Sequence, residues 1–280
     1  MLLCRLKGID KNMNNVKNDE PQIYYEYNLA NLYDYLPTFG VWKRKNLDLI
    51  NKPFMEGAKL TDGRVLEFAT ATGMLTIPLA RMGYKVTSLD ISPYMHDIVR
   101  DKLKNEEQYV SENITLIRQD CVKYCADEPF DMIAIPDGMF IALENQERQM
   151  ECLRSCNRNL RKGGRLYFDI AKPVSIAMSH PECLYKSGNY ITYKRFRDKD
   201  GIPFIITLNT SIEPWEQRCD LKYEFKEYQG EKVYPDIDIS YRYVHYGELV
   251  LMLEQNGFRV INIDTDFFFG RYFFVTAEKK

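Results

Sequence analysis

Short apolar runs alternate with amphipathic stretches along the chain, and this pattern predicts an α/β fold. A nearly continuous apolar run at 65–69 is typical of a strand buried on both faces. The small residues at 70–73 predict a tight turn, 74–81 predicts a helix, and 85–90 predicts a second strand that ends in Asp90. Together these segments predict a β-α-β unit.

Further segments extend the pattern. Residues 113–120, 130–135 and 165–169 predict three more strands, and 248–258 predicts a helix. Between the fifth strand and this helix, apolar and polar residues alternate with period two, which is typical of half-buried antiparallel strands. The alternating segments are 190–196, 204–208, 221–228 and 237–243, with turn signals at 199–201 and 229–231. We expect three or four inserted strands, which could roof a substrate pocket or form a dimer surface.

Residues 21–60 carry aromatic residues at helical spacing. They predict a helical segment that either closes over a ligand as a lid or only packs on the body of the protein. The sequence therefore divides into a mobile segment at 1–20, a helical lid at 21–60, an α/β core at 61–171, an antiparallel β insertion at 172–243, and a helix with strands that complete the core at 244–280.

The β-α-β unit predicts a ligand that contains a nucleoside. Asp90 follows Glu67 by 23 residues (90 minus 67), about the spacing at which the acid after the second strand meets ribose hydroxyls. A pyrophosphate would need the third glycine of G-x-G-x-x-G, but Thr76 or Met74 stands there, so NAD and FAD are disfavoured. The sequence also lacks the G-x-x-x-x-G-K-[ST] pattern of P-loop NTPases.

The turn resembles motif I of the class I S-adenosylmethionine (SAM)-dependent methyltransferases, [V/I]-L-[D/E]-x-G-x-G-x-G. Glu67 and Gly73 match this motif, whereas Ala69 and Ala71 stand where glycines are commoner. Alanine at the first of these places is a familiar variant, so Ala71 is the main departure. Its methyl group could push back the methionine end of the cofactor, or the backbone there could have a negative φ.

Other landmarks of the same family follow in order. Residues 90–95 resemble the D-x-S-x-x-M start of its second helix, and 113–121 resemble a third strand that ends in the acid near adenine. Residues 160–169 are similar to its L-x-P-G-G turn and fifth strand, with Lys162 in place of proline. Residues 248–258 resemble its E-L-x-x-L-L-x-x-A-G-F helix.

The resemblance covers residues 24–171 and 243–278. It implies a Rossmann-like, mostly parallel sheet of seven strands with helices on both faces, and SAM as cofactor with S-adenosylhomocysteine as product. The cofactor-binding residues that it implies are Tyr33, Glu67, Ala69, Thr70, Ala71, Gly73, Asp90, Ile91, Met95, Asp120, Cys121 and Pro136. Tyr33-Asp34 resembles a pair in the lid of many small-molecule methyltransferases, and Tyr27, Trp42 and Phe140 are expected to contact substrate.

Candidate catalytic groups are expected at the carboxyl ends of the strands, where open α/β sheets bind ligands. Asp169 ends the fifth strand and Asp137 follows the fourth. A carboxylate there could hold an ammonium group, orient an amine or take its proton. Asp169 could also only cap the next turn, and Asp137 could be only a turn residue. His245 could be a general base, although a lone histidine is more often structural.

The sequence indicates a SAM-dependent N-methyltransferase that acts on an amine of a small molecule or a modified peptide. The insertion resembles those of enzymes that methylate amino sugars, glycine derivatives or peptide antibiotics. The whole chain is similar to plantazolicin-type enzymes, which dimethylate the N-terminal arginine amine of a thiazole/oxazole peptide. An amino-sugar or small-amine N-methyltransferase and an O-methyltransferase are alternatives, and a SAM fold that binds without catalysis is the alternative of another class.

Composition narrows the remaining classes. The chain has 38 Lys+Arg against 40 Asp+Glu and no dense cationic stripe, so a nucleic-acid partner is not expected. No apolar run approaches membrane-spanning length, so no membrane partner is expected. The cysteines have no C-x-x-C spacing and predict buried thiols in a reducing cytoplasm without bound metal, with Cys121/Cys125 and Cys152/Cys156 each sharing a helix face. We expect a cytoplasmic monomer or homodimer.

Overall fold

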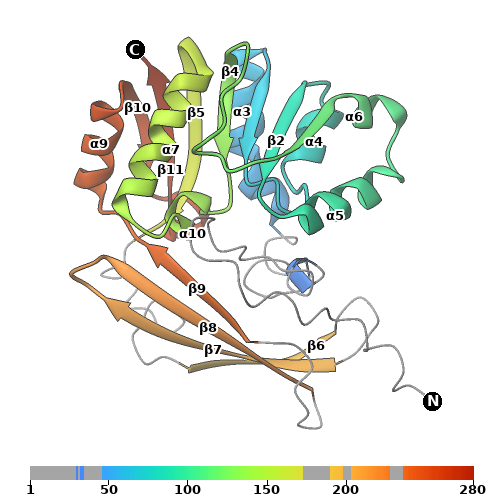
Figure 1. Ribbon diagram of the computed structural model, residues 1–280, viewed down its shortest axis with the longest axis vertical. Helices are drawn as coiled ribbons and strands as arrows, with labels where there is room; N and C mark the ends of the chain where they lie inside the picture. Colours follow the sequence, from blue (N-terminus) through green and yellow to red (C-terminus); the bar gives the residue numbers. More distant parts are fainter. Residues whose placement is uncertain (1–29, 31, 35–45, 173–189, 198–202, 228–235) are drawn as a thin grey trace.

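A computed structural model describes residues 30, 32–34, 46–172, 190–197, 203–227 and 236–280, and its main body is a seven-stranded sheet (Figure 1). The strand order is β10-β11-β5-β4-β1-β2-β3. The strands are β1 (Val65–Phe68), β2 (Val86–Asp90), β3 (Ile114–Arg118), β4 (Phe130–Ile135), β5 (Leu160–Ala171), β10 (Phe258–Asp264) and β11 (Tyr272–Lys279). β1 to β5 pair in parallel, whereas β11 pairs antiparallel with β5 and β10. The predicted mostly parallel sheet is confirmed.

Hydrophobic clusters cover both faces of this sheet. On one face, Phe54 of α3 and Leu79 of α4 belong to a cluster with Tyr167 and Phe274 of the strands. On the other face, α7 packs against β5 and α9, and β1 is buried along its whole length because both faces are covered. The helices are α3 (Leu47–Thr61), α4 (Thr76–Arg81), α5 (Pro93–Leu103), α6 (Gln108–Glu112), α7 (Gln146–Asn159), α9 (Tyr246–Gln255), α10 (Phe267–Gly270) and the short 3-10 helix η2 (Met139–Ala142). Within the described residues, no helix combines the length and apolarity that crossing a membrane requires.

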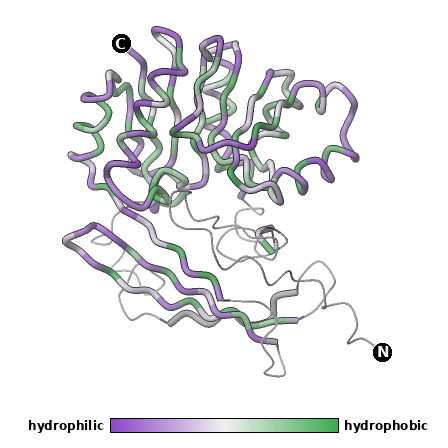
Figure 2. The backbone as a smooth tube through the Cα atoms, in the orientation of Figure 1, coloured by the Kyte–Doolittle hydropathy of each residue, from purple (hydrophilic) through white to green (hydrophobic). Residues whose placement is uncertain are grey.

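A second, antiparallel sheet lies between β5 and α9 in the sequence, and we call it the inserted sheet. Its strands pair in the order β6 (Tyr190–Arg197), β7 (Pro203–Glu213), β8 (Arg218–Glu227) and β9 (Ile237–Arg242). Figure 2 shows hydrophobic and hydrophilic residues alternating along these strands. Leu208, Phe225 and Ile239 are buried and belong to the main core, and the inserted sheet lies beside the carboxyl ends of the parallel strands (Figure 1). The expected antiparallel insertion is confirmed, and its role stays a prediction.

Three local expectations differ from the structure. The glycines at 160–164 do not form a turn before the fifth strand, because β5 is continuous from Leu160 and its register against β4 shifts there. The helix predicted at 74–81 is α4, which begins only at Thr76 because the turn before it extends through residue 75. Cys121 and Cys125 share no helix face, since they lie in a turn with Cys121 buried and Cys125 exposed. The other predicted pair, at 152 and 156, is buried on α7.

Close packing of α3 on β5 can be tested at Gly57. A Cβ atom at Gly57 would lie 2.7 Å from Tyr167 Cζ, whereas one at Gly247 of α9 would have nothing within 4 Å. We expect Gly57→Ala to lower the free energy of unfolding by about 1–3 kcal/mol through overpacking. Gly247→Ala should raise it by up to about 1 kcal/mol, because alanine favours a helix more than glycine does. Urea titrations measure both variants, and effects of the same sign would contradict this packing.

Candidate active site

The chain between β1 and α4 forms a turn that contains residues with positive φ, and we call residues 69–75 the cofactor turn. φ is +60° at Ala69, +45° at Ala71 and +78° at Gly73. The alternative of a negative φ at Ala71 is therefore wrong. The two alanines hold a left-handed conformation that costs an ordinary L-residue about 1–2 kcal/mol. The turn thus keeps a glycine-like backbone without the usual glycines.

Asp90 fixes the cofactor turn against the end of β2. Its Oδ2 accepts a hydrogen bond from the Ala71 backbone N–H at 2.9 Å, and its Oδ1 accepts one from the Ser92 N–H at 2.9 Å. The side chain is buried, and burial raises its pKa to about 6 although backbone hydrogen bonds oppose that rise. A carboxylate has lone pairs beyond these two. Asp90 can therefore hold the turn and still accept hydrogen bonds from a ribose.

Side chains from three other segments also hold the cofactor turn. Thr72 Oγ1 donates to Asp34 Oδ1 at 2.7 Å. Lys102 Nζ of α5 lies 2.8 Å from Asp34 Oδ2 and donates to the Thr72 carbonyl at 2.7 Å. From α3, Asn51 Nδ2 donates to the Met74 carbonyl at 2.7 Å. No sequence motif indicated Lys102 or Asn51.

Tyr33 joins the N-terminal segment to both sides of the site. It is buried in a small cluster with Ala30 and Met95, against which the half-buried Ala71 packs. Its hydroxyl donates to Asp137 Oδ2 at 2.5 Å. Tyr33 therefore packs and also bonds, while closure of a lid stays a prediction. Tyr27 and Trp42, which were also expected over the ligands, lie outside the described residues.

Glu67 of β1 forms hydrogen bonds with side chains near the cofactor turn. Its Oε2 accepts hydrogen bonds from Thr76 Oγ1 at the start of α4 and from Ser88 Oγ of β2, the latter at 2.8 Å. The side chain is 1% exposed. Burial raises the pKa of Glu67 to about 7, outweighing the lowering effect of the two hydroxyls. These contacts give Glu67 a supporting role, and its direct contact with the cofactor stays a prediction.

Asp120 follows β3, next to buried Cys121. Arg148 Nη2 in the first turn of α7 lies 2.8 Å from Asp120 Oδ2, an ion pair that no sequence motif indicated. Asp120 Oδ1 accepts from the Val122 N–H at 3.2 Å. A cofactor amino group would therefore share this carboxylate with Arg148. Ile91, directly after Asp90, is half-buried.

A hydrogen bond joins the two residues that carry the predicted catalytic carboxylates. The Asp137 backbone N–H donates to Asp169 Oδ1 at 2.7 Å, and the Asp169 side chain is 3% exposed. Asp137 follows buried Pro136 at the end of β4 and has φ of +65°. At the carboxyl ends of β4 and β5, the Asp137 backbone is thus bonded to the Asp169 carboxylate, and the Asp137 carboxylate is bonded to the hydroxyl of Tyr33.

Phenol groups lie near these carboxylates. Asp169 pairs with Phe274 across β5 and β11, so Tyr272, two residues away, is on the same face of the sheet. Burial raises the pKa of Tyr272 above its usual value. The negative charge of Asp169 raises this pKa further, and Tyr223 has a smaller effect in the same direction. Tyr223 belongs to the inserted sheet. The inserted sheet therefore contributes to the surroundings of the carboxylates.

Two predicted residues have other surroundings. Phe140 is wholly buried in the main core, with its ring centroid 5.3 Å from that of Phe168. The side chain of Phe140 thus takes part in core packing, and its contact with substrate stays a prediction. His245 is exposed at the N-cap of α9 and its ring lies 5.6 Å from that of Tyr243. This position favours the structural interpretation of His245.

The residues of the cofactor turn fit SAM. Thr70 Oγ1 is buried and has no hydrogen-bond partner in the described part of the chain, and such a hydroxyl is costly unless a ligand completes it. Asp90 supplies acceptors suited to ribose hydroxyls, and Asp120 supplies an acceptor suited to an amino group. Thr70, Asp90 and Asp120 would therefore hold the cofactor.

Comparisons with known proteins agree with this geometry. Residues 65–164 match a family described as "Methyltransferase domain". A candidate methyltransferase, YqeM of Bacillus subtilis (strain 168), is 28% identical over 219 residues, which are 76% of this chain and 81% of that protein. Cypemycin N-terminal methyltransferase of Streptomyces sp is 24% identical over 162 residues, which are 54% of this chain and 62% of that protein.

A solved structure shares the fold. The CcbJ methyltransferase of Streptomyces caelestis matches with a TM-score of 0.73 and 18% identity, covering 91% of this chain and 98% of that chain. The methyltransferase-domain match at residues 65–164 contains the cofactor turn, Asp90, Asp120 and Asp137. The chain contains a methyltransferase domain at residues 65–164, and SAM is its cofactor.

The buried Glu67 predicts a pH dependence of stability. Its pKa is about 7 in the folded protein against 4.5 as an ordinary carboxyl, so the fold favours its protonated form. This contribution is fully present below pH 4.5 and is lost as the pH rises through 7. Between pH 4.5 and pH 8, we expect wild type to lose about 3 kcal/mol more free energy of unfolding than Glu67→Gln does. Urea titrations at both pH values measure this, and equal losses would contradict it.

Proposed function

We propose that this methyltransferase transfers the methyl group of SAM to an amine. The observation that carries the proposal is the linked pair Asp137 and Asp169 at the ends of β4 and β5, with the Tyr33 hydroxyl bonded to Asp137. Carboxylates attract a protonated amine and can accept its proton. A phenol acceptor must develop negative charge, which the same carboxylates would disfavour. The charge of the site therefore supports N-methylation over O-methylation.

The proposed roles follow from what methyl transfer requires. Bound SAM supplies a methyl group on a positively charged sulfur. The acceptor nitrogen forms its bond to carbon as the carbon–sulfur bond breaks, and its proton moves to a carboxylate oxygen of Asp169 or to water. Asp137, fixed by its N–H on Asp169 Oδ1 and by the Tyr33 hydroxyl, orients the amine. Orientation of this kind can supply several kcal/mol of the barrier.

The acceptor that we favour is the N-terminal amine of a modified peptide. The similarity to cypemycin N-terminal methyltransferase over 54% of this chain supports this choice. A plantazolicin-type peptide, with arginine before its azole rings, would bring a guanidinium group that suits carboxylates. Tyrosine and phenylalanine side chains would line a channel for its flat rings. Amino sugars and small amines are the alternative acceptors of the same chemistry.

A methylation assay with three probes tests the proposal. Arginylglycinamide, D-glucosamine and p-cresol are incubated separately with the full chain and SAM, and mass spectrometry detects methylated products. We expect the dipeptide amide to be methylated on nitrogen. Methylation of glucosamine alone would favour the amino-sugar alternative over the peptide. Methylation of p-cresol alone would overturn N-methylation.

The role of Asp169 can be tested separately. With the probe amine that wild type methylates, we expect Asp169→Asn to lower kcat/KM by about 100-fold, in the range that general base catalysis contributes. The affinity for S-adenosylhomocysteine should stay within about twofold of wild type, because Asp169 lies at the acceptor side. Asp238→Asn, an exposed carboxylate on β9, is the control. An unchanged kcat/KM in Asp169→Asn would remove the proposed role.

A further inference from the structure

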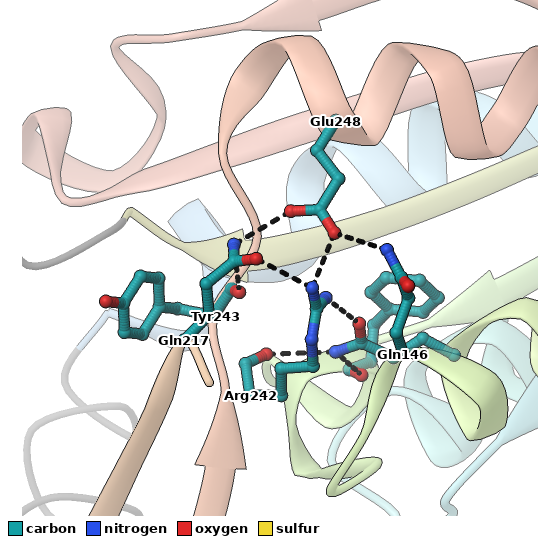
Figure 3. Close-up of polar contacts among 7 residues, drawn as sticks. Gln146, Gln217, Arg242, Tyr243 and Glu248 are labelled. Carbon is teal, nitrogen blue, oxygen red and sulfur yellow. Dashed lines mark hydrogen bonds and ion pairs between the residues drawn. The ribbon is translucent and has the colours of Figure 1, made fainter. Parts of the chain in front are cut away.

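A polar network centred on the buried Arg242 joins the inserted sheet to the methyltransferase core, and we call it the Arg242 joint (Figure 3). It consists of Arg242 at the end of β9, Glu248 in α9, Gln217 between β7 and β8, and Gln146 and Gln149 in α7. Arg242 Nη2 lies 2.5 Å from Glu248 Oε1 and 2.7 Å from Gln217 Oε1. Its Nη1 donates to Gln149 Oε1 at 2.7 Å.

The carboxylate of Glu248 accepts hydrogen bonds from three other members of the joint. Gln217 Nε2 donates to Glu248 Oε2 at 2.8 Å, and Gln146 Nε2 donates to Glu248 Oε1 at 2.9 Å (Figure 3). Burial would raise the pKa of Glu248, but the hydrogen bonds from Gln217 and Arg242 outweigh it and lower the pKa. Glu248 is thus held as a charged partner for a guanidinium that is only 6% exposed. Removing the charge of Glu248 would leave the buried guanidinium of Arg242 without its charged partner.

The joint is connected to the loop that carries Asp137. Gln149 Nε2 donates to the Arg242 carbonyl at 2.9 Å and to the Phe140 carbonyl at 3.3 Å. Phe140 lies in η2, which begins directly after Asp137 and Gly138, two residues with φ of +65°. β9 packs against η2, and η2 packs against β5. The same side chain, Gln149, therefore contacts both the inserted sheet and the Asp137 loop.

We propose that Arg242 is a positioning residue for the acceptor site. It locks the inserted sheet onto the core and, through Gln149, fixes residues 136–142 so that Asp137 keeps its place beside Asp169. The proposal rests on the proposed function in taking Asp137 and Asp169 as the acceptor site. It assigns no contact between Arg242 and either ligand.

The chemistry of the joint requires arginine. One planar guanidinium serves Glu248, Gln217 and Gln149 through two nitrogens, whereas a lysine ammonium is a point charge without that fork. Hydrophobic packing of the inserted sheet continues without the joint, since its buried face belongs to the main core. Arg242→Lys should therefore loosen the joint while the sheet stays attached. Glu248→Gln removes the charge from the other side and is the second variant.

Hydrogen exchange measures the coupling directly. In η2, the Met139 N–H donates to the Pro136 carbonyl and the Ile141 N–H to the Gly138 carbonyl. We expect both variants to speed exchange of the peptide covering 136–142 at least fivefold, with exchange at 65–73 unchanged and S-adenosylhomocysteine affinity within twofold of wild type. If exchange at 136–142 is unchanged in both variants, the proposal is overturned. An equal rise across the whole chain would also overturn it, because the effect would then be general destabilisation.

A matched control variant lies at the other end of β5. Lys279 Nζ donates to the Asn157 carbonyl at 2.6 Å and to the Leu160 carbonyl at 2.7 Å, so it also joins separate elements. Lys279→Met should leave exchange at 136–142 and S-adenosylhomocysteine affinity as in wild type. A faster exchange at 136–142 in this control would show that loss of any side-chain hydrogen bond between separate elements loosens the loop. That result would overturn the specific role of Arg242.

Kinetics supply the second readout, with arginylglycinamide as the probe amine. We expect Arg242→Lys to lower kcat/KM for the amine at least fivefold, because a misplaced Asp137 orients the amine less well, with KM for SAM within twofold of wild type. An unchanged kcat/KM for the amine would contradict positioning of the acceptor. If wild type does not methylate this amine, the favoured peptide acceptor fails, but the exchange experiment still decides whether the joint controls the loop.

Discussion

The buried carboxylate of Asp90 is the contact on which the rest of the site depends. It accepts hydrogen bonds from the N–H group of Ala71 in the cofactor turn and from that of Ser92 at the N-cap of α5. The turn that it holds contains two alanines with positive φ, a conformation that only a strongly constrained backbone retains. Asp34 with Lys102 constrains the same turn from the N-terminal segment and α5. A cofactor turn without its usual glycines is thus maintained by side chains around it.

The proposed acceptor site is built from different elements and depends on contacts between residues far apart in the sequence. Asp137 and Asp169 are linked at the ends of β4 and β5, and Tyr33 reaches Asp137 from the N-terminal segment while packing near Ala71. One tyrosine therefore connects the cofactor turn with the acceptor site. From the other direction, the proposed Arg242 joint would connect the inserted sheet with the same loop.

Sequence patterns predicted the strands whose positions follow from the local periodicity of apolar residues. β4 matches its predicted bounds, and the strands of the inserted sheet lie where period-two alternation indicated them. The positive φ at Ala71 could not be predicted, because alanine ordinarily avoids it and distant hydrogen bonds impose it. Lys102, Arg148 and Arg242 were missed for a related reason: each pairs with a residue that has no fixed spacing from it in the sequence. The complete burial of Phe140 could not be predicted either, because position after a strand does not reveal burial in the core.

Calorimetric titration of S-adenosylhomocysteine into wild type and Asp90→Asn is the most direct test of the central claim, that Asp90 and the cofactor turn form the SAM site. Wild type should bind one equivalent. Asp90→Asn should bind S-adenosylhomocysteine at least tenfold more weakly while retaining cooperative unfolding. The substitution removes the negative charge of the side chain that accepts hydrogen bonds from the turn and is expected to accept them from the ribose. Absence of binding to wild type, or equal affinity in the two proteins, would contradict the account.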